Sequence, residues 1–169
     1  MSRHNLIPVV IAALCCVTTN LAAQQPSTNP QLTPYGAPVS VEVARKAAAA
    51  ALAEARKNNW LMAVAVVDPA GDLVYYEKMD NTQLGSAKVS VNKARSAALF
   101  KRPTKAFQDS VAGGGAGLRV LGLEGAVPLE GGVPLVVDGK IIGAIGLSGD
   151  SSDHDGQCAR AGADAIQNP

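Results

Sequence analysis

Residues 131–147, GGVPLVVDGKIIGAIGL, contain the strongest local structural signal in the chain. Two runs rich in aliphatic and β-branched residues, 133–137 and 140–147, flank the pair Asp138-Gly139. Asp-Gly is typical of a two-residue turn between antiparallel strands, because both turn positions need a positive φ. We therefore predict a β-hairpin over this stretch.

A second hairpin is predicted upstream of the first. Residues 61–68 form a run dense in β-branched side chains, and residues 73–79 are predicted to form a second strand. Between them, Pro69 presets a turn and Gly71 supplies the positive φ that a short connection needs. The two runs should therefore pair as antiparallel neighbours.

Helices are predicted around these hairpins from apolar residues at helical spacing and from capping residues. Ser40 and Ser86 are the expected N-caps of the first two helices, and Ser152 with Asp155 resembles a capping box for the last. The expected helices cover residues 41–58, 86–100, 105–111 and 152–166, and the glycine-rich residues 113–117 should be irregular. This order predicts an α/β protein of the α+β type, with a predominantly antiparallel sheet built from two hairpins and covered by helices.

The N-terminal residues 1–23 have the pattern of a signal peptide: a basic start, a short apolar stretch and small residues at Ala22 and Ala23. The apolar stretch is too short to span a bilayer, so no stable membrane anchor is expected after cleavage. Residues 24–38 are rich in Pro, Ser, Thr, Asn and Gln and are expected to be a flexible linker, followed by a single domain over residues 39–169. We expect the mature protein to be periplasmic or secreted.

The charge pattern argues against a nucleic-acid partner. The formal net charge is +1, and no run of Lys and Arg with interleaved aromatic residues occurs. Beyond residue 23 the chain has one cysteine, Cys158, which excludes an intramolecular disulfide in the mature chain.

His154 and Cys158 lie four residues apart on the predicted last helix, so both can face the same way. Imidazole and thiolate at this spacing could bind a metal or a haem iron. Two ligands alone make a poor structural zinc site. The favoured alternative is a surface or capping histidine beside a cysteine in the core, because free cysteine often packs as a small apolar residue.

The densest polar cluster of the folded region is on the predicted second helix: Lys88, Asn92, Lys93 and Arg95. Its cations could meet the propionates of a haem or the carboxylate of a small acid. The alternative is a solvated helix face.

Two further residues have a chemical and a structural interpretation. Thr104 follows Pro103 at a helix start, where a capping hydroxyl is favoured over a ligand group. Glu130 could act as an acid or base if the fold brings it to a pocket, although most loop glutamates are solvated. No Gly-x-Ser-x-Gly elbow and no complete catalytic constellation is visible, so a hydrolase is not expected.

Seven segments, taken together and in this order, resemble the GlcG/HbpS-like family. They are residues 66–74, 79–80, 92–95, 102–104, 131–135, 143–149 and 159–162. Each alone is a turn, a helix start or a packing signature, whereas their ordered combination from about residue 40 onward is specific. The resemblance implies a three-layer fold, assembly into homo-oligomers, and haem binding in the exported members and in a related domain of cobalamin metabolism.

The same resemblance implies a haem site. The residues at the matching positions are Lys93, Arg95, Thr104, Gly131 and Gly132. The two glycines would allow close approach of the backbone to the ligand, and the Thr104 hydroxyl would be a weak iron ligand suited to exchangeable binding. Use of His154 as an iron ligand would be a local feature of this chain.

The leading expectation is an exported haem-binding protein that sequesters or transfers haem and can degrade it slowly. One alternative is an enzyme for a small oxo or hydroxy acid or an aromatic-pathway carbonyl compound. In that enzyme Arg95 or Lys93 would hold the carboxylate, and Glu130 or His154 would move a proton. A third possibility is an accessory or sensing subunit without chemistry.

Overall fold

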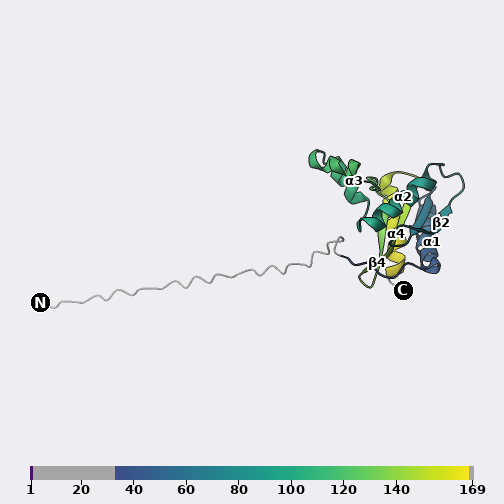
Figure 1. Cartoon of the computed structure of the whole chain (residues 1–169), viewed down its shortest axis with the longest axis horizontal. Helices are drawn as coiled ribbons and strands as arrows, with labels where there is room; N and C mark the ends of the chain where they lie inside the picture. Colours follow the sequence, from purple (N-terminus) through teal and green to yellow (C-terminus); the bar gives the residue numbers. More distant parts are fainter. Residues whose placement is uncertain (2–32, 168–169) are drawn as a thin grey trace.

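The computed structural model describes Met1 and residues 33–167 (Figure 1). The predicted signal peptide and most of the predicted linker therefore lie outside the described residues. The last part of the predicted linker does contact the domain. Gly36 donates a backbone hydrogen bond to the Ile141 carbonyl at 2.8 Å, and Val39, the first residue of the predicted domain, donates one to the Ile142 carbonyl at 2.8 Å.

The sheet has four antiparallel strands in the order β2-β1-β4-β3. The strands are β1 (Ala63–Val67), β2 (Leu73–Lys78), β3 (Gly132–Val137) and β4 (Lys140–Ser148). Both predicted hairpins are confirmed, and β1 pairs with β4 to join them. Asp138 and Gly139 have φ of 49° and 70°, as the two-residue turn requires.

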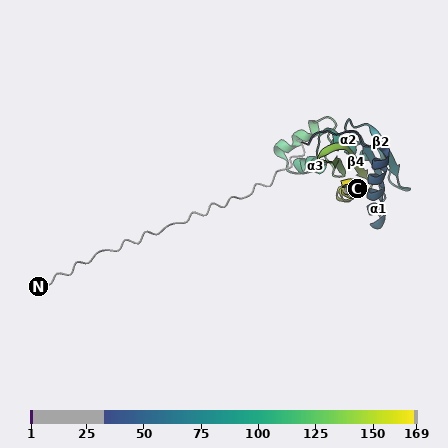
Figure 2. The same ribbon diagram turned by 90° about the horizontal axis from the view of Figure 1, so that it is seen from below.

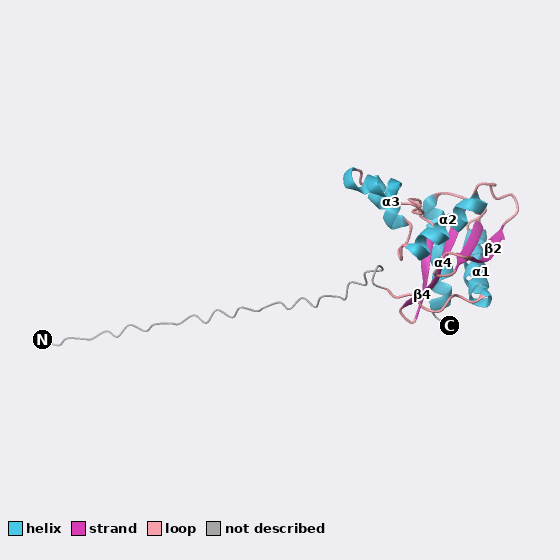
Figure 3. Ribbon diagram, in the orientation of Figure 1, coloured by secondary structure: helices cyan, strands magenta, loops and turns pink. Residues whose placement is uncertain are grey.

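Helices cover both faces of this sheet, giving three layers (Figures 2 and 3). One face is covered by α1 (Val41–Lys57) and α4 (Ser152–Gln167), and the other by α2 (Ser86–Leu99). A further segment, made of α3 (Lys105–Ala112) and the 3₁₀ helix η2 (Gly115–Gly122), projects from the body of the molecule (Figure 1).

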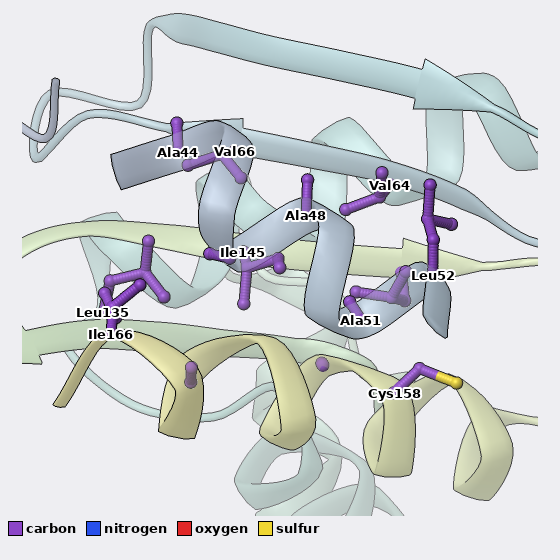
Figure 4. Close-up of a cluster of buried hydrophobic side chains, with 14 of the residues drawn as sticks. Ala44, Ala48, Ala51, Leu52, Val64, Val66, Leu135, Ile145, Cys158 and Ile166 are labelled. Atoms are coloured by element: carbon purple, nitrogen blue, oxygen red, sulfur yellow. The ribbon is translucent and has the colours of Figure 1, made fainter. Parts of the chain in front are cut away.

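The main core lies between the sheet and the helix pair α1 and α4 (Figure 4). Alanines such as Ala48 and Ala51 let α1 come close to the larger strand residues Val64 and Ile145, all of them fully buried. A second cluster, built almost entirely from alanine and valine, packs α2 on the opposite face. Small side chains thus set the close spacing of the three layers.

Capping at the helix starts differs in part from the predictions. Ser40 caps α1 as expected, accepting from the Val43 N–H at 3.2 Å. The predicted cap Ser86 is wrong: it lies inside α2, is fully buried, and its Oγ accepts from the Ser148 hydroxyl at 3.3 Å. A sequence pattern locates a capping hydroxyl but does not reveal a buried partner 62 residues away.

Two other local predictions are also wrong. The glycine-rich stretch is not wholly irregular, because η2 begins at Gly115. The capping box at the start of α4 does not form: Ser151 Oγ accepts from the His154 N–H at 3.4 Å, and Asp155 turns inward.

Candidate functional site

A buried ion pair joins the two helix layers. Lys93 Nζ of α2 donates to Asp155 Oδ2 of α4 at 2.6 Å, and the two side chains are only 2% and 3% exposed. Burial raises the pKa of Asp155, and the Lys93 cation opposes this shift. The predicted polar cluster is therefore wrong in one member: Lys93 is buried, whereas Lys88, Asn92 and Arg95 are exposed.

Gly131 makes room for this ion pair. A Cβ at this position would lie 2.8 Å from Asp155 Cβ and 2.9 Å from Lys93 Nζ, and the backbone has φ of 129°. Its carbonyl also accepts from the Leu147 N–H at 2.9 Å, which holds it beside the end of β4. Glycine is needed here because the chain itself approaches closely.

A second ion pair lies next to the first. Arg160 donates to Glu130 Oε1 at 2.6 Å, and the Glu130 side chain is 5% exposed whereas that of Arg160 is 54% exposed. Gly156 of α4 provides the space, since a Cβ there would lie 2.6 Å from Glu130 Cδ. Glu130 is thus buried and paired, which its position in a loop did not predict.

Thr104 and Gly132 are joined by two hydrogen bonds. The Gly132 N–H donates to Thr104 Oγ1, and the Thr104 N–H donates to the Gly132 carbonyl, both at 2.9 Å. The Thr104 hydroxyl makes no capping bond, so the favoured capping interpretation is wrong. A Cβ on Gly132 would lie 2.7 Å from Thr104 Cγ2. Thr104, Gly131 and Gly132 are all buried, and their role toward a ligand stays a prediction.

His154 and Cys158 point to different surroundings. The His154 ring stacks on Trp60 with centroids 3.8 Å apart, and its Nδ1 lies 2.7 Å from Asp150 Oδ1. Cys158 is fully buried in the core (Figure 4), where burial raises the pKa of its thiol to about 12. Within the described residues, no group of three or more His, Cys, Asp or Glu side chains is arranged to hold a metal ion.

Arg95 lies on another surface, between α2 and the edge strand β2. Its Nε donates to the Gly71 carbonyl at 2.9 Å, which anchors the guanidinium against the turn of the first hairpin. Here an open groove of about 480 Å³ is lined by two residues of β2 and five of α2. They are Leu73, Tyr76, Ala87, Lys88, Val91, Asn92 and Arg95.

This surface, named here the α2–β2 groove, continues into a second hollow. The second hollow has a volume of about 330 Å³ and shares Asn92 and Arg95 with the first, and Leu99 and residues 125–127 complete it. Both volumes lie in the range of small-molecule sites. The groove combines apolar walls with cationic side chains, an arrangement suited to a ligand that is apolar and carries carboxylates.

Sequence reasoning identified the cations of this groove but missed its apolar part. Leu73 and Tyr76 are 49% and 37% exposed, and the sequence pattern indicates only that both belong to a strand. The register supplies the missing signal: Tyr76 pairs with Ala65 and Leu73 with Val67, and both partners belong to the cluster under α2. The bulge between Val66 and Val67 brings both exposed side chains to that face.

Comparison with known proteins agrees with this architecture. The family model described as "Haem degrading protein HbpS-like" matches residues 39–164. The chain belongs to the HbpS-like family. Protein GlcG of Escherichia coli K12 is 43% identical over 110 residues, which cover 65% of this chain and 81% of GlcG.

Solved structures place this HbpS-like protein beside two kinds of relative. The crystal structure of an HbpS variant from Streptomyces reticuli is 28% identical, with a TM-score of 0.69, covering 94% of this chain and 97% of that one. The crystal structure of a PduOC:haem complex is also 28% identical, with a TM-score of 0.68, covering 76% of this chain and 94% of that one. The predicted family and α+β fold are confirmed.

Proposed function

We propose that this protein binds haem in the α2–β2 groove and sequesters it or passes it on outside the cytoplasm. The observation that carries the proposal is the groove itself, where apolar side chains and two cations line one open surface. The family description and the haem complex of PduOC support haem as the ligand.

The chemistry of the groove fits the proposed ligand. Haem has a flat apolar ring and two carboxylates, so it needs apolar contact together with cationic partners. Leu73 and Val91 offer apolar contact, and Lys88 and Arg95 offer the charges. Arg95 is already oriented by its bond to Gly71, which reduces the entropy lost on binding a propionate. When bound, haem would supply the iron and any oxidative chemistry.

The open groove favours exchangeable binding. A ligand held on one exposed surface keeps part of its area in water and leaves more readily than one enclosed in a cavity. This agrees with sequestering or transfer. Slow oxidative loss of the bound haem is the second part of the proposal, supported by the family description. It is tested by following the haem absorbance with added hydrogen peroxide, against free haemin.

A haemin titration of the chain from residue 24 onward tests the proposal. Saturable binding with a shifted haem absorbance is expected. Arg95→Gln should weaken binding about tenfold, because a hydrogen bond to a charged group contributes about 1.5–3 kcal/mol and exposure places this one at the low end. Thr104→Ala and His154→Ala, run alongside, test the ligand roles predicted from sequence. Featureless, unsaturable absorbance in the wild type would overturn the proposal.

Export and self-association complete the proposal. The predicted signal peptide supports a periplasmic or secreted location, and none of the helices within the described residues is long and apolar enough to cross a membrane. Four exposed leucines support a homo-oligomer, since they lie on or just after the projecting segment. They are Leu118, Leu121, Leu123 and Leu129. Cell fractionation and light scattering test these two points.

A further inference from the structure

The α2–β2 groove contains one side chain suited to bind ferric iron. Of its seven lining residues, three are aliphatic and Asn92 offers only a neutral amide. Lys88 is exposed, and its side chain, like that of Arg95, offers hydrogen-bond donors and no acceptor atom for a metal. Tyr76 remains, and its phenolate is an anionic oxygen ligand of the kind that holds haem iron in catalase.

The strand register aims Tyr76 into the groove. Tyr76 pairs with Ala65, which packs under α2, and the neighbouring Tyr75 packs against the main core on the other side of the sheet. Tyr75 donates its hydroxyl hydrogen to Glu77 Oε2 at 2.8 Å. Tyr76 is 37% exposed, so a bound ligand could reach it without movement of the strand.

Binding of the Tyr76 oxygen to ferric iron would exchange one proton and one water molecule. The phenol of Tyr76 gives up its proton to solvent, and its oxygen replaces water on the ferric iron. Partial burial raises the pKa of Tyr76, which disfavours the free phenolate and keeps the phenol protonated until a cation is present. Lys88 and Arg95, which line the same groove, favour the anion that forms.

We infer that Tyr76 is the iron ligand of this haem site and makes the groove selective for ferric haem over metal-free porphyrin. The inference rests on the proposed function, because it requires haem to occupy the α2–β2 groove.

Tyr76→Phe tests the inference, because it removes the oxygen and keeps the ring. The matched control is Tyr75→Phe, which removes a hydroxyl from the adjacent residue on the opposite face. Each variant and the wild type are titrated with ferric haemin and with metal-free protoporphyrin IX, and the ferric complexes are compared by electron paramagnetic resonance.

The inference predicts that Tyr76→Phe changes the ferric resonance spectrum and weakens haemin binding by about tenfold or more, as for loss of a charged contact. It also predicts unchanged protoporphyrin binding, and Tyr75→Phe should match the wild type throughout. If the wild type binds haemin and the Tyr76→Phe spectrum is unaltered, the inference is wrong and the proposed function stands. If the wild type binds neither porphyrin, the proposed function itself fails.

Discussion

Replacement of Lys93 by methionine should be among the most damaging single changes to this domain. Methionine has a similar length, but the change leaves the Asp155 carboxylate buried without its cation. Breaking a buried ion pair in this way costs about 3–5 kcal/mol. A domain of this size is stable by about 5–15 kcal/mol, so the loss should be evident in urea unfolding.

The loss should depend on pH in a defined direction. Burial already raises the pKa of Asp155, and removing Lys93 raises it further, because the cation is the main group that lowers it. A carboxyl with a raised folded-state pKa stabilises the fold below its unfolded value and loses that contribution as pH rises through the folded value. The stability of Lys93→Met should therefore be much closer to that of the wild type near pH 4 than at pH 7.5. The lower pH is chosen because it lies near the ordinary pKa of Asp, about 3.9.

A double variant separates the charge effect from lost packing. In Lys93→Met with Asp155→Asn, the neutral amide oxygen can still accept from the Asp150 N–H, which lies 3.3 Å from Asp155 Oδ1. Most of the lost stability should return, because a buried pair can be replaced by neutral groups at little cost. A Lys93→Met loss below about 1 kcal/mol, or one that is equal at both pH values, would contradict the role assigned to this ion pair.

Three other outcomes are expected from the packing. Gly146→Ala should lower the free energy of unfolding in urea by about 1–3 kcal/mol or more, because a Cβ there would lie 2.5 Å from the Ala94 nitrogen. Gly122→Ala is the control, and it should be close to neutral because the space around Gly122 is open. In the folded chain from residue 24 onward, Cys158 should resist a thiol reagent at pH 8, since it is buried and its pKa is raised to about 12. In urea it should react fully. Rapid reaction in the folded chain would contradict the place of Cys158 in the core. Leu121→Asp, at a 65% exposed position, should lower the mass measured by light scattering without lowering thermal stability, and an unchanged mass would separate this leucine from self-association.

The strands and helices were largely predictable from sequence, because turn chemistry and periodicity are local. Asp138-Gly139 forms its own turn, and Ser40 caps the helix that follows it by accepting from an N–H three residues on. The family resemblance then added the arrangement in three layers, which no local pattern contains.

The polar residues were predicted less well, because their environment is set by distant partners. Lys93 and Arg95 are two positions apart on one helix, yet Lys93 reaches Asp155, 62 residues on, while Arg95 bonds Gly71 on the outer surface. Helical spacing alone separates such positions by about 200°, which would have distinguished the two faces. The partner on α4 could not be known from spacing.

Nuclear magnetic resonance can locate bound haem on the protein and so test directly whether it occupies the α2–β2 groove. Ferric haemin broadens amide signals close to its iron, and the gallium porphyrin serves as the diamagnetic control. If haem occupies this groove, broadening should centre on Leu73, Tyr76 and Val91, and the signals of Thr104 and His154 should be retained. Broadening centred on Thr104 or Gly131, with the α2–β2 groove unaffected, would contradict it.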